Sequence, residues 1–243
     1  MKWKLKWEDQ FEMDGKPNPK HWQLEVGGHG FGNNEAQYYT DNLKNAYVKD
    51  GILHIVGLKE NLNENHYTSA KLTTLNKHSI KYGRIEVMAK LPKGRGTWPA
   101  IWFLGENIGD VGWPMCGEID LMEHVGHKEE RIHFSLHADS HHHLIGNQPT
   151  YVEDIKGILD GFHEYALEWD QEGITFFLDG IKKVSFMRKD YLHIQNWPFD
   201  KPFYLILNIA LGGTWGGAID DSIFPTEFLF KYIKVYERSD LDD

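Results

Sequence analysis

The sequence has little of what marks several other classes of protein. Its single cysteine, Cys116, excludes an internal disulfide. Acidic residues outnumber basic ones by 36 to 26, and the net charge of −10 excludes an extended basic surface for nucleic acid or anionic membrane. No apolar run approaches the roughly 18 residues that span a membrane. We therefore expect no nucleic-acid partner and no membrane partner.

The sequence also leaves the cellular compartment open. The first six residues, rich in lysine, lack the apolar core of a signal peptide. The chain is then either a secreted protein whose signal has been removed or a cytoplasmic one. A single cysteine does not decide between these compartments, because it removes only one positive sign of an oxidising environment.

What the chain does contain is typical of one all-β domain. We find no internal repeat, linker or low-complexity tract, so we predict a single domain over residues 1–243. Nine Trp, eleven Tyr and thirteen Phe supply a large core, and 24 Gly separate short apolar runs of period two. Such strands favour two stacked antiparallel sheets, with a curved inner sheet that offers a concave cleft to a chain-like ligand.

The strands are predicted from alternating apolar and polar residues, and the turns from Asp-Gly pairs. Expected strands cover residues 52–58, 67–74, 82–91, 97–104, 118–124, 131–137, 163–169, 173–178, 203–210 and 229–236. Hairpin turns are expected at 50–51 and 179–180. Segments 152–159 and 191–196 read as a helical turn or a loop, since neither has enough periodicity to decide.

Three carboxyl groups fall within six residues of one apolar strand. On a regular strand Glu118 and Asp120 would share a face with Met122, and Glu123 would point the other way. One extra residue near Leu121-Met122 would bulge out and bring all three acids to one face. We therefore predict a β-bulge in this strand.

Two carboxyls on one face, one protonated and one ionised, are what cleavage of a glycosidic bond requires. Long side chains on a twisted strand can lean to the roughly 5 to 5.5 Å separation of retaining hydrolases, so we predict retention of configuration. The alternatives are a solvated acidic strand face or a calcium loop. The apolar residues Ile119, Leu121 and Met122 disfavour the loop, because calcium ligands usually come from Gly- and Asp-rich segments.

Several segments outside this strand carry a family resemblance. They are Gly-Asn-Asn-Glu-Ala-Gln-Tyr-Tyr-Thr at 32–40, Tyr-Thr-Ser-Ala-Lys-Leu at 67–72, Tyr-Gly-Arg-Ile-Glu-Val at 82–87, Gly-Thr-Trp-Pro-Ala-Ile-Trp at 96–102, Phe-His-Glu-Tyr at 162–165, Asn-Ile-Ala-Leu-Gly-Gly at 208–213 and Tyr-Ile-Lys-Val-Tyr at 232–236. Together with Gly-Glu-Ile-Asp-Leu-Met-Glu-His at 117–124, they resemble glycoside hydrolase family 16, in its bacterial laminarinase (endo-1,3-β-glucanase) branch.

The resemblance implies a β-jelly-roll sandwich of the concanavalin A-like type. It implies that Glu118 is the nucleophile, Glu123 the acid/base and Asp120 their electrostatic assistant. Met122 is similar to the extra residue of bulged members, which include laminarinases, rather than to the unbulged lichenases. The expected partner is a β-glucan polysaccharide or oligosaccharide, and the expected assembly is a monomer.

Four tryptophans are candidates for stacking on glucose rings. Trp113 and Trp215 lie among glycines, in segments that suit binding loops. Trp98 and Trp102 are four apart on a strand and so share a face, which the resemblance turns toward the cleft. A structural aromatic ladder is the alternative for this pair. The remaining five tryptophans, at positions 3, 7, 22, 169 and 197, are expected in the core.

Three polar residues complete the predicted binding set. His137 shares a strand face with His133 and is expected beside Asp120, where a hydrogen bond would tune the carboxyl. By resemblance, Arg84 donates to sugar hydroxyls or steadies the nucleophile, and an ion pair with its neighbour on the same face is less favoured. Asn33 is the best of three polar residues at 33, 35 and 37 that would contact sugar hydroxyls.

Two possible metal sites are weighed and set aside. The run His141-His142-His143 is read as a solvated loop, because adjacent histidines rarely converge on one ion. Many family members hold a structural calcium, but here the expected ligand position in the last strand is Lys231, whose ammonium cannot bind a cation. We expect Lys231 to fill that place, paired with Glu12, and therefore predict no metal and no cofactor.

Two other functions remain open for this fold. One is a non-catalytic β-glucan-binding module, as in animal relatives that typically lack the glutamates, whereas this chain has both. The other is a related enzyme on another polysaccharide. The leading prediction is endo-acting, retaining hydrolysis of 1,3-β-glucan, with activity on mixed 1,3-1,4 linkages left open.

Overall fold

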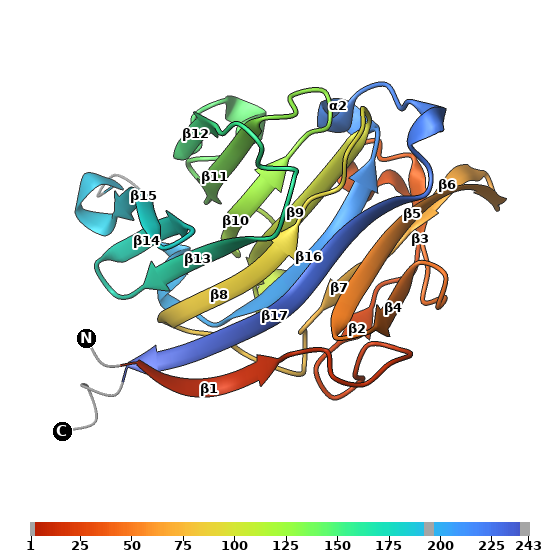
Figure 1. Cartoon of the computed structure of the whole chain (residues 1–243). Helices are drawn as coiled ribbons and strands as arrows, with labels where there is room; N and C mark the ends of the chain where they lie inside the picture. Colours follow the sequence, from red (N-terminus) through yellow and green to blue (C-terminus); the bar gives the residue numbers. More distant parts are fainter. Residues whose placement is uncertain (1–2, 192–196, 239–243) are drawn as a thin grey trace.

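The computed structural model describes residues 3–191 and 197–238, and this part of the chain forms two stacked β-sheets (Figure 1). Among the described residues, one sheet has seven strands in the order β12 (Thr150–Asp154), β11 (Arg131–His137), β10 (Glu118–His124), β9 (Thr97–Gly105), β16 (Phe203–Leu211), β7 (Lys71–Thr73) and β2 (Gln23–Leu24). The predicted sandwich is confirmed.

The second sheet has ten strands within the same described ranges. Its main order is β15 (Ile181–Met187), β14 (Gly173–Leu178), β13 (His163–Trp169), β8 (Gly83–Lys90), β17 (Thr226–Arg238), β5 (Ile52–Leu62), β6 (Asn65–Ser69) and β3 (Gln37–Tyr39). β1 (Trp3–Asp9) pairs with β17, and β4 (Ala46–Lys49) pairs with β5. β3 and β6 run parallel, which departs from the expected antiparallel pattern.

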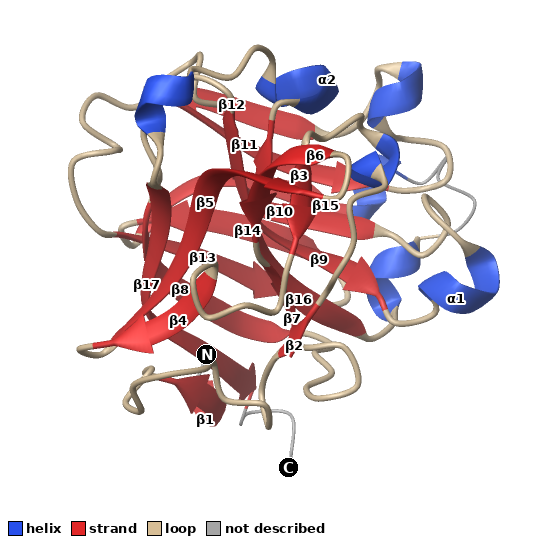
Figure 2. Ribbon diagram, turned by 90° about the vertical axis from the view of Figure 1, so that its right-hand side faces the viewer, coloured by secondary structure: helices blue, strands red, loops and turns tan. Residues whose placement is uncertain are grey.

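Helices are short and lie at the ends and edges of the sheets (Figure 2). They are α1 (Ile108–Val111), α2 (Gly213–Gly216) and the 3-10 turns Gly30–Gly32, His143–Ile145, Arg188–Tyr191, Pro198–Asp200 and Asp221–Ile223. Within the described residues, no helix combines the length and the apolarity needed to cross a membrane.

The core lies between the sheets, and alternation along each strand fills it. On β11 the even-numbered Ile132, Phe134 and Leu136 are buried in the core, and on β8 the odd-numbered Ile85 and Val87 are. The opposite side chains of the seven-stranded sheet point away from the core, and we call this side the open face. Burial of large side chains is the main force that stacks the two sheets.

Most predicted strands are confirmed, and the departures occur where the chain changes sheet or reaches an edge. The expected strand at 67–74 is split at Ala70, where the chain leaves β6 in one sheet and enters β7 in the other. Segment 152–159 begins as the end of edge strand β12 rather than as a helical turn. Segment 191–196 falls largely outside the described residues.

Both predicted hairpin turns are confirmed. Asp50 and Gly51 join β4 to β5, and Asp179 and Gly180 join β14 to β15. All four residues have positive φ angles between 50° and 74°, which is the backbone twist that two-residue hairpins require. Asp and Gly tolerate this region better than other residues, so the dipeptide is a dependable local signal.

Candidate active site

A β-bulge in β10 brings the three carboxyl groups to the open face. The pairing of β10 with β9 shifts between Asp120 and Met122, so that Leu121 is an extra residue. Leu121 and Met122 both lie in the core with 0% exposure, although they are consecutive. The alternation is therefore reset, and Glu123 returns to the side that carries Glu118 and Asp120. The predicted bulge is confirmed.

Glu118 lies at the start of β10 and is held by a tryptophan. Its Oε2 accepts a hydrogen bond of 2.8 Å from the indole nitrogen of Trp113. Its Oε1 is 3.6 Å from Nε2 of His137, and 15% of its side chain is exposed. Burial, and then the charge of Asp120, raise the pKa of Glu118 to about 8. Trp113 and His137 oppose this rise, because both stabilise the ionised carboxylate.

Glu123 lies toward the end of β10 in a more aromatic environment. Its Oε1 accepts a hydrogen bond of 3.2 Å from the indole nitrogen of Trp98. Trp98 meets Trp215 edge to face at 5.4 Å between ring centroids, and Trp215 meets His133 at 4.8 Å. Burial, and then the charge of Glu118, raise the pKa of Glu123 to about 7. A carboxyl with such a pKa can carry a proton near neutral pH.

Asp120 lies between the two glutamates and is 1% exposed. Its Oδ2 is 3.1 Å from Nε2 of His137 but has no hydrogen-bond partner. Burial, and then the charge of Glu123, raise the pKa of Asp120 well above its ordinary value. A hydrogen bond between Asp120 and Glu118 opposes that rise, and such a bond requires one shared proton. The three carboxyls therefore do not all ionise together.

This arrangement matches the requirements of glycosidic cleavage. Both glutamates have raised pKa values and each accepts one indole N–H, so neither these bonds nor burial alone separates their roles. What separates them is Asp120, which is hydrogen-bonded to Glu118 and can hold the shared proton, so that Glu118 can be ionised while Glu123 keeps its own proton. A scan of the sequence against family models is consistent with this chemistry, because residues 11–223 match the glycosyl hydrolases family 16. The chain belongs to this family.

Comparison with individual proteins places the family 16 chain among glucanases. It is 43% identical to the beta-glucanase of Rhodothermus marinus over 96% of this chain and 85% of that protein. It is 36% identical to the glucan endo-1,3-beta-glucosidase of Cryptopygus antarcticus, over 88% of this chain and 83% of the relative. The crystal structure of the Rhodothermus marinus laminarinase superposes with a TM-score of 0.93, covering 97% of this chain and 98% of that one at 42% identity.

The four predicted tryptophans all lie on or beside the open face. Trp113 and Trp98 bind the two glutamates, and Trp215, in α2, packs on Trp98. Trp102 donates a hydrogen bond of 2.7 Å to Oδ1 of Asn208. Each keeps part of its surface exposed, as a ring that stacks on sugar must. Of the five expected in the core, those at 22, 169 and 197 are buried, and those at 3 and 7 are half-buried.

A polar chain of residues extends the site away from the carboxyls. Asn208 donates to the hydroxyl of Tyr39 at 2.9 Å, and that hydroxyl donates to Glu35 at 3.3 Å. Asn33 also donates to Glu35, at 3.2 Å. Gln37 is fully buried and bonds both Glu35 and the backbone, so its role is structural. The motifs at 32–40 and 208–213 signalled this region, but not the contact between them.

Sequence reasoning missed Lys71, a largely buried cation on the open face. Lys71 is 9% exposed, and its ammonium lies 2.8 Å from Glu25. It also lies 5.4 Å from the ring centroid of Trp102 and 5.0 Å from that of Phe31. A cation between two rings and a carboxylate is well placed to donate to sugar hydroxyls. Nothing in its local pattern separates it from an ordinary strand lysine.

The histidine run also proves to be part of the site. His143 and His142 lie 5.0 Å and 5.3 Å from Trp113 between ring centroids, and His143 lies 5.4 Å from His137. His143 is exposed, as expected of a solvated loop, but the run is not solvated throughout, because His141 is buried and His142 is half-buried. The loop between β11 and β12 folds back over the indole that holds Glu118, a contact between segments about 30 residues apart that the sequence pattern does not reveal.

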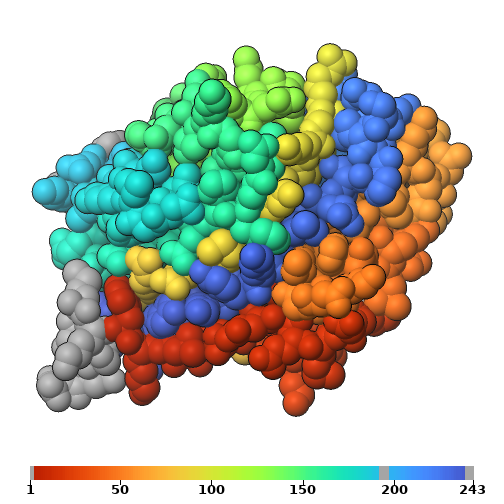
Figure 3. Space-filling view, viewed as in Figure 1, coloured from red at the N-terminus to blue at the C-terminus, as the bar shows by residue number. Residues whose placement is uncertain are grey.

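The structure contradicts the predicted role of Arg84. This residue lies on β8 in the ten-stranded sheet, on the side opposite the buried Ile85, whereas the carboxyls are on the seven-stranded sheet. Its guanidinium is 2.7 Å from Glu86, 3.0 Å from Glu168 and 3.8 Å from Glu164. The ion pair that was disfavoured therefore forms. Figure 3 shows this side of the molecule, with β8 in yellow beside β17 in blue.

The predicted pairing of Lys231 with Glu12 is absent from the described part of the chain. Lys231 is an extra residue at a bulge in β17, and its ammonium lies 4.3 Å over the ring of Phe162. An ammonium held on an aromatic face offers no oxygen, so this position does not fit a calcium ligand.

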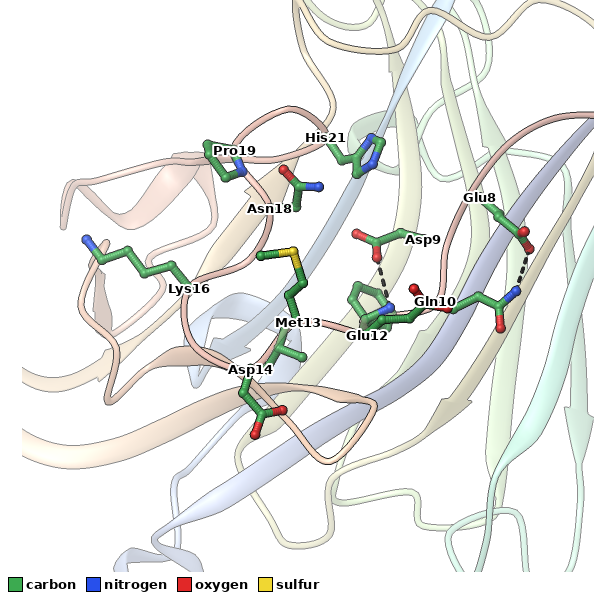
Figure 4. A pocket seen from close by; sticks show the side chains of 12 residues that line it. Glu8, Asp9, Gln10, Glu12, Met13, Asp14, Lys16, Asn18, Pro19 and His21 are labelled. Carbon is green, nitrogen blue, oxygen red and sulfur yellow. Dashed lines mark hydrogen bonds between the residues drawn. The ribbon is translucent and has the colours of Figure 1, made fainter.

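Glu12 lines a separate hollow of about 320 Å³ near the N-terminus (Figure 4). Asp9 in that hollow accepts hydrogen bonds from Trp22 and from the backbone of Phe11, and Glu8 accepts one from Gln10. The carboxylates of Asp9 and Glu8 thus have hydrogen-bond donors from within the chain. None of the residues that line the hollow belongs to the set of three acidic residues on β10.

Proposed function

We propose that this protein hydrolyses 1,3-β-glucan internally, with retention of configuration. The observation that carries the proposal is the bulge that turns Glu118, Asp120 and Glu123 to one face, each glutamate with its own indole donor. Family membership and the glucanase relatives support the choice of substrate.

In the proposed mechanism, Asp120 holds the proton that it shares with Glu118, so that Glu118 is ionised. Glu118 attacks the anomeric carbon while Glu123 donates its proton to the departing glycosidic oxygen. A covalent glycosyl-enzyme results, and Glu123, now ionised, removes a proton from the water that hydrolyses it. His137, beside both Glu118 and Asp120, stabilises negative charge while the proton moves.

Sugar rings would be held by the aromatic and polar groups around the carboxyls. Trp98, Trp102 and Trp215 present partly exposed rings, on which the apolar face of a glucose unit can stack. Lys71 and Asn33 provide donors for hydroxyl groups on the same side. An uncharged polymer suits this part of the face, because Lys71 is already paired with Glu25 and Glu35 already accepts a hydrogen bond from Asn33.

The test is incubation with laminarin, followed by reducing-end assay and proton NMR of the first products. We expect β-configured new reducing ends that mutarotate only later, and chain shortening that precedes release of glucose. α-Configured first products would contradict retention. Curdlan and lichenan, measured in parallel, decide between strict 1,3 and mixed-linkage specificity. Undiminished cleavage by Glu118→Gln would refute the assignment, and binding without cleavage by the unmodified protein would favour a glucan-binding module.

We also propose that this family 16 protein needs no structural calcium. Lys231 stands where the last-strand ligand is expected and packs on Phe162. We expect the melting temperature in excess EDTA to equal that in millimolar calcium, within about 1 °C. A lower melting temperature in EDTA that calcium restores, but magnesium does not, would contradict this.

A further inference from the structure

The geometry points to a second ligand for the nucleophile side of this site: a zinc ion held by Glu118, Asp120 and His137, in a position that excludes the glucan. The binding of zinc is a property of these three side chains alone. The inhibition that it causes rests on the proposed function.

The three side chains converge at distances that suit a tetrahedral ion. Nε2 of His137 is 3.1 Å from Oδ2 of Asp120 and 3.6 Å from Oε1 of Glu118. One ligand atom from each residue lies within 4.8 Å of the others. Ligands about 2.0 to 2.2 Å from zinc at tetrahedral angles are separated by roughly 3.4 Å, which the two distances bracket.

The ligand atoms are also available. Oδ2 of Asp120 has no hydrogen-bond partner although the residue is 1% exposed, and it is aimed at His137. Burying such an oxygen without a partner is costly, and a cation would satisfy it. Trp113 binds Oε2 of Glu118 and fixes the carboxylate in place, with Oε1 turned toward Nε2 of His137. The ion would displace the proton that Glu118 shares with Asp120.

The chemistry of the set selects a transition metal rather than calcium or magnesium. It offers one imidazole and two carboxylates, and three protein ligands with a fourth open position are the usual pattern of accessible zinc sites. Calcium requires six to eight oxygens and magnesium a near-octahedral set, which these side chains do not supply. An ion on Oε1 of Glu118 would occupy the carboxylate that attacks the sugar in the proposed mechanism, so zinc and glucan would exclude each other.

Other histidine groups within residues 3–191 and 197–238 are poorer candidates. His21 and His78 form a pair 2.6 Å apart at their nitrogens, but no third ligand from His, Cys, Asp or Glu converges on them. His142 and His143 stack on Trp113, and they do not converge with a third such residue either. Variants of His21 and His78, which lie outside the site, therefore serve as controls.

Binding is tested directly by calorimetric titration of the full protein with zinc chloride. We expect one ion per chain, and an affinity at least tenfold lower in Glu118→Gln and in His137→Gln. Asp120→Asn provides a third measurement if either variant melts early. His21→Gln and His78→Gln should retain the affinity. Loss of binding in either control, unchanged binding in all three site variants, or no binding at 1 mM zinc would each overturn the inference.

Inhibition is tested with the same protein on laminarin. Zinc should raise KM without lowering kcat, doubling KM when its concentration equals the dissociation constant from the titration, and EDTA should restore the original value. Calcium and magnesium should have no effect. A zinc effect on kcat alone would contradict competition at this position. If the protein cleaves no glucan in zinc-free buffer, the proposed function fails, whereas the titration still decides the zinc site.

Discussion

The two ends of β10 form matched environments that differ in what they do to a charge. At each end a glutamate accepts one indole N–H, from Trp113 at 2.8 Å and from Trp98 at 3.2 Å. At the Glu118 end an imidazole lies 3.6 Å from the carboxyl and Asp120 is hydrogen-bonded to it, whereas the surroundings of Glu123 are mostly aromatic. Glu118 can therefore pass a proton to a neighbouring group, whereas Glu123 can only keep or release its own proton.

The histidines beside the two ends also differ from each other. His137 lowers the pKa values of both Glu118 and Glu123, because its positive charge would favour their ionised forms. His133, opposite Glu123 across the strand pair, has its pKa lowered to about 4, chiefly by burial, and so stays neutral. Similar residues at the two ends thus serve different roles, because burial and neighbours rather than residue type decide the charge.

The strongest test of the comparison replaces each glutamate in turn. Glu118→Gln should lower kcat/KM on laminarin by about 10⁴-fold or more, because no group remains to form the covalent intermediate. Glu123→Gln should cost about 10² to 10⁴-fold. On a substrate with a good aryl leaving group, the first step of Glu123→Gln should recover, because that group departs without a proton. Recovery in Glu118→Gln instead would reverse the two roles.

A smaller effect separates the two indole donors. Trp113→Phe removes a hydrogen bond to a carboxylate, worth about 1.5 to 3 kcal/mol, so kcat should fall by roughly 10 to 100-fold. Trp98→Phe removes a longer bond to a group that is protonated in the resting state, and should cost only a few-fold.

The pH profiles of the two tryptophan variants should differ as well. Loss of a donor raises the pKa of the carboxyl that it served. In Trp113→Phe the acidic limb of kcat/KM should therefore move to higher pH, because Glu118 stays protonated longer. In Trp98→Phe the alkaline limb should move to higher pH, because Glu123 keeps its proton longer. The same limb moving in both variants would contradict the separation of roles.

The cost of ionising the buried carboxyls at the Glu118 end should also change the stability of the fold with pH. Glu118 and Asp120 share a proton and titrate as a pair, and burial holds the last proton of this pair to about pH 8, the raised pKa of Glu118, against an ordinary value of 4.5. The stability of the protonated pair is therefore present below pH 4.5 and is lost as pH rises through 8. Glu118→Gln stays uncharged throughout. We expect its melting temperature to exceed that of the unmodified protein by about 4 °C or more at pH 8, and to match it near pH 4.5. A gap that widens toward low pH would be inconsistent with this account.

The smallest effect on activity is expected far from β10, at Arg84. Its side chain is 15% exposed and contacts three glutamates, so Arg84→Met should lower stability by about 1 to 3 kcal/mol. Melting temperature should fall while KM for laminarin stays unchanged. Lys93→Met, at an exposed ion pair with Asp160, is the matched control and should alter neither value. A raised KM in Arg84→Met would restore its predicted role at the substrate.

The sequence predicted the parts of the site that depend on one strand. Glu118, Asp120 and Glu123 needed only the alternation of a strand and one extra residue. The errors arose where the partner lies elsewhere in the chain. The side chain of Arg84 lies on the face of its strand that the alternation predicts, but alternation does not indicate which of the two sheets the strand joins. Lys71 reads as an ordinary surface residue until Phe31 is folded against it.

By itself, the sequence determined the strands, the hairpin turns and the bulge, because these depend on backbone preferences and on side chains a few residues apart. Only the tertiary structure decided that Arg84 belongs to the outer face of the other sheet, that the histidine loop covers Trp113, and that Lys71 lies beside Trp102. The physical reason is that which strands become neighbours depends on the packing of the whole core, which no local pattern contains.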